Sequence, residues 1–403
     1  MFKKNSVGID IAERTVEVAE LCGSKENPKI LNIGRVEFES GIVSRGRIKK
    51  KARLVEVIKE ALSSAKPGPV MGKSVVFGLP ESQACIRVFQ FKNCNREQLK
   101  YFIQSKVKKN IPIPQEDLVY SYKILDGGED YIDVLVAAAN KRVLNEWLDL
   151  FKELKLDLKI FDIEALAIFR GLAAKKEEQP LGIIDLGAST ANISIFDKNK
   201  LRHSRIVFIA GDEITKDIAN KYQLGFREAE ERKANADLSA MNQLSAMILQ
   251  TLDLIAEETK NTFEHWSDSS GKKIEEVLLV GGTAKFNGIA EYFTRKLSIK
   301  TKIITEKGAS FLHVEAIGLA MRGLDDNVEG DEPFIPMPVP RVKKLNKNTH
   351  IKESIRSEEV KFKIILVLLI IISGAFLLGF SIFYKSKINL QEEMYKKIEN
   401  LNL

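Results

Sequence analysis

Two segments of the chain have the residue types of a phosphate-binding turn. Each is an apolar run that ends in an aspartate, passes through a short turn and continues as a second apolar run; they are Val7–Thr15 and Gly182–Thr190. Backbone N–H groups in such a turn can bind phosphate oxygens, and a hydroxyl such as that of Thr15 adds a donor. Asp10 and Asp185 are placed to hold Mg²⁺ through its waters, because this ion dehydrates reluctantly. The pattern indicates a duplicated unit, repeated after about 175 residues, that would hold a triphosphate between its copies.

A third segment has the glycines of a nucleoside site. An apolar run at 277–280 is followed by Gly281 and Gly282, and then by a helical pattern at about 286–296. Glycine lacks a side chain, so the flat face of a nucleoside can approach the backbone closely there. Each of the three segments is a weak signal by itself. Their order and separations together predict a nucleotide-binding site.

The elements that must position these residues alternate between strand and helix. The apolar periodicity predicts strands at 6–11, 15–21 and 30–38, and helices at 52–63, 95–109, 141–154 and 241–266. The first 330 residues are long enough for two domains. We therefore expect an α/β fold that contains both copies of the hairpin unit.

The C-terminal part has a different composition. Residues 325–360 are acidic, then proline-rich, then basic, and we expect a flexible linker with a basic juxtamembrane segment. Residues 364–384 carry no charge and would be roughly 31 Å long as a helix, which matches the hydrocarbon core of a bilayer. We therefore predict a transmembrane helix at 361–385. The tail, 386–403, is expected to be a solvated segment or a short helix that pairs with a partner.

Charge indicates the orientation of the predicted span and the class of partner. More lysines and arginines flank its N-terminal end than its C-terminal end, which places the large N-terminal part in the cytoplasm. The net charge of +7 owes much to the basic juxtamembrane stretch, which suits anionic membrane lipid. The globular part has no stripe of basic and aromatic residues, so nucleic acid is not an expected partner. The four histidines lack the spacing of a metal site, and the odd number of cysteines favours reduced thiols.

The sequence resembles the actin-like ATPase superfamily and, within it, the PilM family of type IV pilus assembly proteins, which is related to the cell-division protein FtsA. The resemblance covers about residues 5–323 and rests on the three segments above together with 162–167 and 210–215. It implies an actin-like ATPase fold of two duplicated domains, domain I at 1–182 and domain II at 183–324. It also implies an extra subdomain inserted near 80–156.

The same resemblance implies the role of each site residue. ATP and Mg²⁺ would be the cofactors, with Asp10 and Asp185 holding the ion through water and Glu164 orienting a hydrolytic water. The other implied nucleotide contacts are Thr15, Gly187, Ser189, Thr190 and Gly211 near the phosphates, Glu230 and Lys233 at the ribose and adenine, and Gly281 and Gly282 under the base. Considered from the residues alone, Glu230 and Lys233 are also consistent with an ion pair on a helix surface.

The first turn departs from the family pattern. Where the family has a glycine and small hydroxyl residues, this chain has Ala12, Glu13 and Arg14. Ala12 adds a Cβ where the backbone should touch phosphate, and Glu13 brings a negative charge toward a triphosphate. Arg14 would offset that charge if it turned inward. We therefore expect ATP binding with weak or no hydrolysis.

Three functions are consistent with such a chain: a membrane-anchored scaffold of the inner-membrane platform that assembles type IV pili, a small-molecule kinase, and an FtsA-like division tether. A kinase gains nothing from a span, and FtsA-type tethers usually lie on the membrane through an amphipathic helix, so we favour the scaffold. The favoured function includes competence systems, and the alternative is an L-type platform protein of type II secretion or the FtsA-like division tether.

The resemblance also implies partners. These are PilN-like and PilO-like proteins of the bacterial inner membrane, and a second copy of this chain through self-association. The order of linker, basic peptide, span and short helix in 334–403 resembles a PilM–PilN-like fusion. In such a fusion, the peptide at 341–348 would dock on the extra subdomain or lie on anionic lipid.

Overall fold

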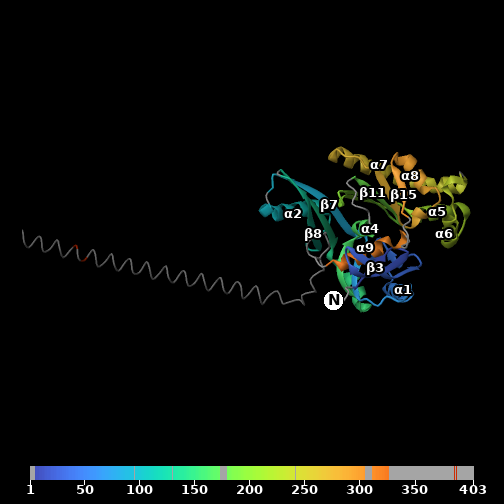
Figure 1. Ribbon diagram of the computed structural model, residues 1–403, viewed down its shortest axis with the longest axis horizontal. Helices are drawn as coiled ribbons and strands as arrows, with labels where there is room; N and C mark the ends of the chain where they lie inside the picture. The colour runs from blue at the N-terminus through green and yellow to red at the C-terminus, as the bar shows by residue number, and fades with distance from the viewer. Residues whose placement is uncertain are drawn as a thin grey trace, which may run out of the picture. The chain divides into compact units, whose positions relative to one another are not determined.

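The computed structural model describes residues 5–94, 96–128, 130–172, 179–240, 242–304 and 311–325, together with Lys385 and Lys387. All but the last two belong to one compact unit, residues 1–338 (Figure 1). The predicted linker after Asp325, the apolar run at 364–384 and nearly all of the tail lie outside the described residues. Within the described ranges, no helix is both long enough and apolar enough to cross a membrane.

Two five-stranded sheets carry the two hairpins. The first has the order β10-β6-β1-β2-β3 and consists of β1 (Asn5–Ile11), β2 (Thr15–Ser24), β3 (Asn27–Glu37), β6 (Ser74–Leu79) and β10 (Asp157–Ile163). The second has the order β13-β12-β11-β14-β15 and consists of β11 (Leu181–Leu186), β12 (Ala191–Asp197), β13 (Lys200–Val207), β14 (Glu276–Val280) and β15 (Lys300–Ile303).

The two sheets have the same topology. The central strand, β1 or β11, pairs antiparallel with the strand that follows it and parallel with β6 or β14. The remaining strands extend each sheet in corresponding positions. The α/β class and the duplicated hairpin are therefore confirmed.

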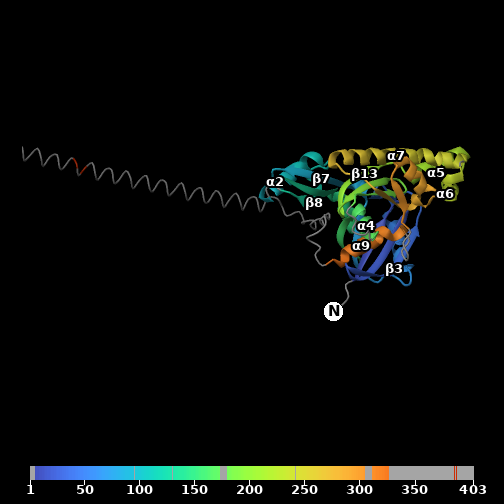
Figure 2. The same cartoon turned by 45° about the horizontal axis from the view of Figure 1, so that its top comes forward.

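The predicted helices agree with the structure to within a few residues at most ends. The helices are α1 (Lys51–Ser63), α2 (Arg96–Asn110), α3 (Lys141–Glu153), α4 (Glu164–Gly171), α5 (Gly211–Tyr222), α6 (Phe226–Ala234), α7 (Gln243–Ser270), α8 (Ile289–Leu297) and α9 (Val314–Leu324). Short 3₁₀ turns are η1 (Glu81–Gln83), η2 (Leu238–Ala240), η3 (Gly282–Lys285) and η4 (Phe311–His313), and β4 (Val43–Ser44) pairs with β5 (Arg47–Ile48). The long α7 runs beside the second sheet (Figure 2).

An inserted subdomain separates β6 from β10. It contains a three-stranded sheet of order β7-β9-β8, formed by β7 (Ala84–Lys92), β8 (Leu118–Gly127) and β9 (Tyr131–Asn140), and it includes α2 (Figure 1). Ile103 and Val107 of α2 pack against this sheet in a separate apolar cluster. The chain returns to the first sheet through α3, whose Trp147 lies 4.7 Å from Phe77 between ring centroids. The inserted subdomain therefore has a sheet and an apolar cluster of its own.

Close packing of α9 brings together the ends of three elements, β1, α4 and α9. A Cβ at Gly8 of β1 would lie 1.9 Å from the carbonyl oxygen of Ala316, and a Cβ at Gly318 would lie 1.8 Å from that of Ala167. Glycine at both positions lets α9 lie directly on β1 and α4. The end of β1 and the first turns of α4 and α9 therefore meet. The predicted boundary assigned α9 to domain II, whereas its packing is against the sheet of domain I.

Candidate functional site

The two hairpin turns and the Gly281–Gly282 turn line one cavity of about 500 Å³. The predicted site residues that line it are Asp10, Thr15, Glu164, Asp185, Gly187, Ser189, Thr190, Glu230, Lys233, Gly281 and Gly282. Gly211 lies behind the second turn, where its N–H donates to the carbonyl oxygen of Gly187 at 3.3 Å. The structure thus brings together residues that are far apart in the sequence.

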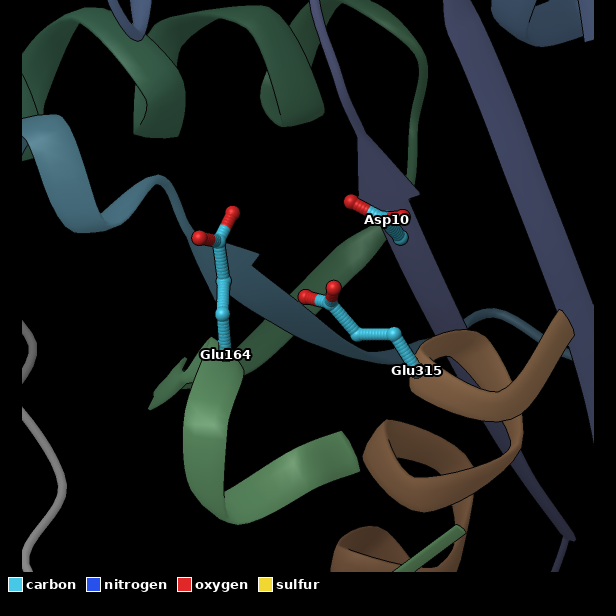
Figure 3. Close-up of side chains that lie close together, drawn as sticks. All are labelled: Asp10, Glu164 and Glu315. Carbon is cyan, nitrogen blue, oxygen red and sulfur yellow. The ribbon is translucent and has the colours of Figure 1, made fainter. Parts of the chain in front are cut away.

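Three carboxylates meet at one end of this cavity. Asp10 at the end of β1, Glu164 at the start of α4 and Glu315 in the first turn of α9 point toward one another (Figure 3). One oxygen from each lies within 4.8 Å of the other two. A Cβ at Gly78 would lie 2.5 Å from Oε1 of Glu315, so glycine leaves the space that this carboxylate fills. Sequence reasoning missed Glu315, although a glutamate within the apolar pattern of α9 was a signal for it.

Burial governs the protonation of these groups. Loss of hydration raises the pKa values of Asp10, Glu164 and Glu315 well above their ordinary range, and the neighbouring carboxylates raise them further. Burial also raises the pKa of Asp185 to about 6, with a smaller contribution from the charge of Glu17. These acids hold protons at neutral pH more readily than exposed acids do. A cation in the cavity would displace those protons.

Glu17 is a second residue that the sequence prediction missed. It lies opposite Asp10 in the antiparallel pairing of β1 and β2, and Nε of Arg35 donates to its Oε1 at 2.9 Å. Burial raises the pKa of Glu17, and the charge of Arg35 opposes this shift. Arg35 also pairs with Glu37. The positive charge of Arg35 therefore offsets the negative charges of Glu17 and Glu37 in the first sheet.

Glu81 connects the site to the inserted subdomain. Its backbone N–H donates to Oε2 of Glu164 at 3.0 Å, and its own Oε2 accepts from the hydroxyl of Ser204 on β13 at 3.1 Å. Burial raises the pKa of Glu81 to about 7. Because η1 leads directly into β7, the N–H that orients Glu164 belongs to the segment that enters the subdomain. The resemblance implied that the subdomain begins near residue 80, but it did not reveal this contact.

The second phosphate turn is tightly closed. The N–H of Gly187 donates to the carbonyl oxygen of Thr190 at 3.0 Å, and the hydroxyl of Thr283 donates to the carbonyl oxygen of Gly187 at 3.1 Å. Gly281 has a φ of +88°, and a Cβ there would lie 2.3 Å from Oδ1 of Asp185. Only glycine fits both this backbone conformation and this close approach. The Gly281 turn therefore packs directly against the acid of the second hairpin.

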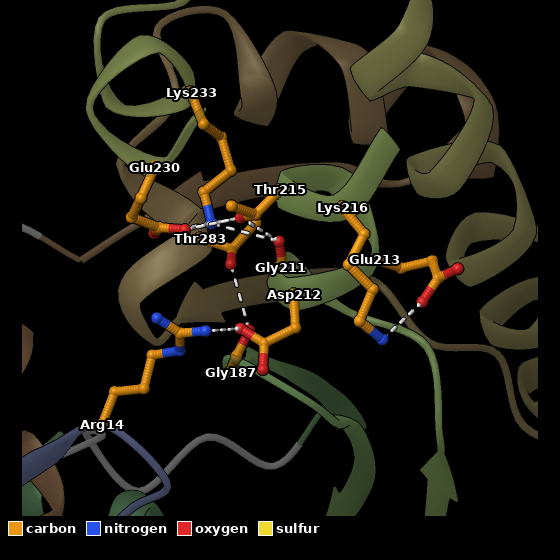
Figure 4. A network of polar contacts seen from close by, with 10 residues as sticks. All are labelled: Arg14, Gly187, Gly211, Asp212, Glu213, Thr215, Lys216, Glu230, Lys233 and Thr283. Atoms are coloured by element: carbon orange, nitrogen blue, oxygen red, sulfur yellow. Dashed lines mark hydrogen bonds and ion pairs between the residues drawn. The ribbon is translucent and has the colours of Figure 1, made fainter. Parts of the chain in front are cut away.

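Lys233 lies in a buried polar network with Glu230 (Figure 4). Its ammonium group donates to the carbonyl oxygen of Gly211 at 3.1 Å, to the hydroxyl of Thr215 at 2.8 Å and to Oε2 of Glu230 at 2.8 Å. Burial lowers the pKa of Lys233, and Glu230 opposes this shift. An ammonium has three donors, and all three are used here. Because the ammonium donors are all used, only the methylene stem of Lys233 is left to contact a nucleobase.

The first turn makes contacts that the sequence pattern did not reveal. Oε1 of Glu13 accepts a hydrogen bond from the backbone N–H of Arg45, which partly satisfies the charge expected to face the phosphates. Arg14 crosses to the second half of the unit, where its Nη2 lies 2.9 Å from Oδ1 of Asp212 (Figure 4). Its guanidinium also lies 4.3 Å from the ring centroid of Phe226. The first turn is therefore tied to α5 and α6.

The cavity fits a metal-bound nucleotide better than a free one. Eleven carboxylates and four cationic side chains line it, so a bare triphosphate would be repelled. Carboxylate and amide oxygens are ligands that Mg²⁺ prefers, and Oδ1 of Asn192, opposite Asp185 on β12, is buried without a hydrogen-bond partner among the described residues. Among the described residues other than its two chain neighbours, none has an atom within 4 Å of a Cβ placed at Gly282, which leaves space for a flat group. The residues thus fit both groups.

Comparison with known proteins identifies the family. A sequence model for the type IV pilus assembly protein PilM matches residues 8–323. The chain belongs to the PilM family. Cell division protein FtsA of Bacillus subtilis (strain 168) is 22% identical over 301 residues, which are 68% of this chain and 67% of FtsA. FtsA of Buchnera aphidicola subsp. Baizongia pistaciae is 30% identical over 101 residues, which are 23% of this chain and 22% of that protein.

Solved structures show the same fold. The structure of a PilM–PilN type IV pilus biogenesis complex has a TM-score of 0.69 at 20% identity and covers 79% of this chain and 98% of that one. Ethanolamine utilization protein EutJ from Carboxydothermus hydrogenoformans has a TM-score of 0.52 at 16% identity, covering 80% and 90%. At these identities the similarity shows the fold alone. The predicted actin-like ATPase fold is confirmed.

Proposed function

We propose that this member of the PilM family is a nucleotide-binding scaffold of the type IV pilus assembly platform. It binds ATP with Mg²⁺ between its two duplicated halves, and the bound nucleotide fixes how the halves are arranged. The observation that carries the proposal is the shared cavity, which has both hairpin acids, Asp10 and Asp185, on its wall. Its volume of about 500 Å³ lies in the range of pockets that hold small ligands.

The residues around the cavity have distinct roles in this proposal. Asp10, Asp185 and Asn192 hold the ion, directly or through water, and the N–H groups and hydroxyls of the turn at 187–190 bind phosphate. Gly282 leaves room for the base. Glu230 binds the ribose, and the stem of Lys233 lies along the adenine. The bound ion would supply the positive charge that brings a triphosphate into an acidic cavity.

Weak or absent hydrolysis follows from the state of Glu164. A residue that orients an attacking water should be a charged acceptor near neutral pH. Burial and the charge of Glu81 raise the pKa of Glu164 well above its ordinary value, although the N–H of Glu81 opposes this. Oε2 of Glu164 also already accepts the backbone N–H of Glu81 at 3.0 Å, which leaves less of this carboxylate to orient a water, so the nucleotide serves as a structural ligand.

The proposed partner is a PilN-like protein, and the proposed location is the inner membrane. A PilM–PilN complex has been solved for a protein of this fold, and the inserted subdomain offers β8 as an edge strand for an extended peptide. Residues 364–384 would anchor the chain as a single span, with 1–324 in the cytoplasm. PilO-like proteins, anionic lipid and a second copy of this chain are further proposed contacts. The 22% identity to FtsA keeps a division tether as the second candidate.

Isothermal titration of the full-length chain with ATP tests this proposal. We expect saturable binding with Mg²⁺ and loss of binding when EDTA replaces it, together with turnover slower than about one per minute. Titration with inorganic phosphate under the same conditions is the control and should give no heat. Absence of ATP binding with Mg²⁺ present would refute the nucleotide-binding role.

A further inference from the structure

The first phosphate turn closes as the second does, with the N–H of Ala12 donating to the carbonyl oxygen of Thr15 at 3.0 Å, but it has Arg14 where the second has Ser189. Ala12 occupies the position after the strand, and the carboxylate of Glu13 is held by the backbone N–H of Arg45. The next residue, Arg14, is the cation of this turn and lines the cavity. A guanidinium presents a planar fork of donors that matches phosphate geometry.

Arg14 lies beside the second phosphate turn. Its partner Asp212 is in the first turn of α5, and the backbone N–H of Asp212 donates to the carbonyl oxygen of Ala188 at 2.6 Å. The guanidinium of Arg14 therefore extends from the first phosphate turn to Asp212, and Asp212 is hydrogen-bonded to the second phosphate turn. A triphosphate held by both turns would have this group next to it.

Part of the guanidinium is left without a partner. Nε of Arg14 is buried and has no hydrogen-bond partner among the described residues. Two of the other cations of the cavity are already engaged, because Arg35 binds Glu17 and Lys233 binds three oxygens. The aromatic ring of Phe226 holds the plane of the Arg14 guanidinium without using its N–H groups.

We propose that Arg14 is a phosphate-binding residue that distinguishes triphosphate from diphosphate. In the nucleotide-free state its charge is balanced by Asp212. When a nucleoside triphosphate binds, the guanidinium transfers to the terminal phosphate while remaining on Phe226. This inference rests on the proposed nucleotide binding and assigns a recognition role to a residue that the family pattern does not have there.

The test compares the affinities of the full-length chain for ATP and ADP, both with Mg²⁺. Arg14→Ala should weaken ATP binding by about 10- to 100-fold and ADP binding by less than about 3-fold, because one charged hydrogen-bonding group is lost from the terminal phosphate. Arg14→Lys keeps the charge without the fork and should recover only part of the ATP affinity. Arg53→Ala removes a surface arginine of α1 that lies outside the cavity, and it should leave both affinities unchanged.

A second variant separates recognition from folding. Asp212→Asn removes the competitor for Arg14, so ATP affinity should rise by about 3- to 10-fold in this variant but not in the Arg14→Ala background. Equal loss of ATP and ADP binding in Arg14→Ala, or the same response to Asp212→Asn with and without Arg14, would overturn the proposal. If the wild-type chain binds ATP in these experiments, either result removes the role of Arg14 and leaves the nucleotide-binding proposal intact.

Discussion

Asp185 lies directly opposite Asn192 in the antiparallel pairing of β11 and β12. In the first half of the unit, the same pairing places Asp10 opposite Glu17. The spacing of seven residues is thus shared by both hairpins, but the partner is a neutral amide in one and an acid in the other. This difference makes the two hairpin acids unequal.

The inequality predicts which aspartate matters more for Mg²⁺ and ATP. Asp185 has a pKa of about 6 and is mostly charged at pH 7.5, whereas burial and the charge of Glu17 raise the pKa of Asp10 well above its ordinary value. Asp185→Ala should abolish Mg²⁺-dependent ATP binding, and Asp10→Ala should weaken it by about 10-fold. Isothermal titration measures both. Asp157→Ala, at an exposed site of β10, serves as the control. A larger loss of ATP affinity in Asp10→Ala than in Asp185→Ala would contradict this order of the two aspartates.

The buried acids predict a stability that falls with rising pH. Glu81 has a pKa of about 7, compared with 4.5 for an unperturbed glutamate, so the folded chain holds protons that the unfolded chain has released. The free energy of unfolding should therefore decrease between about pH 4.5 and 7, by on the order of 3 kcal/mol from this group.

Thermal melting without Mg²⁺ at pH 5.5 and pH 8 measures this effect. The melting temperature should be lower at pH 8, and Glu81→Gln should reduce the difference because glutamine cannot lose a proton. Glu60→Gln, exposed on α1, should retain the wild-type difference. A melting temperature that rises between these two pH values would show that the acids are not protonated in the folded chain.

Two glycines of the unit are expected to respond differently to the same substitution. Gly318→Ala would place a Cβ 1.8 Å from a backbone oxygen of α4 and should lower the free energy of unfolding by about 1–3 kcal/mol. The Cβ of Gly282→Ala would meet no atom of the described residues within 4 Å apart from its chain neighbours, so stability should change by less than about 0.5 kcal/mol while ATP affinity falls. Urea denaturation and titration give the two quantities. Equal stability losses would argue against the close α4–α9 packing.

Much of the fold could be predicted from the sequence, because its signals are local. Alternating apolar residues and the aspartates at the strand ends predicted both hairpins, and the Gly281–Gly282 turn was visible as a composition signal. Local signals did not reveal the place of Glu81 in the site, and the glutamate in the apolar pattern of α9 did not by itself show that Glu315 lies at the cavity. They reach the cavity only because Gly8 and Gly318 let α9 pack on β1, and because η1 folds back toward α4, which are non-local events.

The contacts of the first phosphate turn were also beyond what the sequence could predict. The sequence established that Glu13 and Arg14 depart from the family pattern, and charge alone suggested that Glu13 opposes phosphate. The structure shows that the turn between β4 and β5 supplies a donor for Glu13, and that α5 supplies a partner for Arg14. Both partners lie outside the hairpin, so hairpin residues alone could not reveal them.

The apolar run at 364–384 predicts firm membrane association. The full chain should stay in the membrane fraction after a carbonate wash, because a spanning helix is not held by surface charge. A chain that carries Leu369→Arg together with Phe376→Arg should be released, since each buried arginine disfavours insertion by about 3 kcal/mol. Fractionation followed by immunoblotting measures both. Release of the unaltered chain would exclude the spanning helix.

In the proposed function, one nucleotide lies between the two halves of the unit and contacts both. Amide hydrogen exchange of the full-length chain, with and without ATP and Mg²⁺, measures this directly. We expect slower exchange on binding in three separate segments at once: 11–15, 187–190 and 281–283. Protection confined to the segments of one half, at saturating ATP, would contradict it.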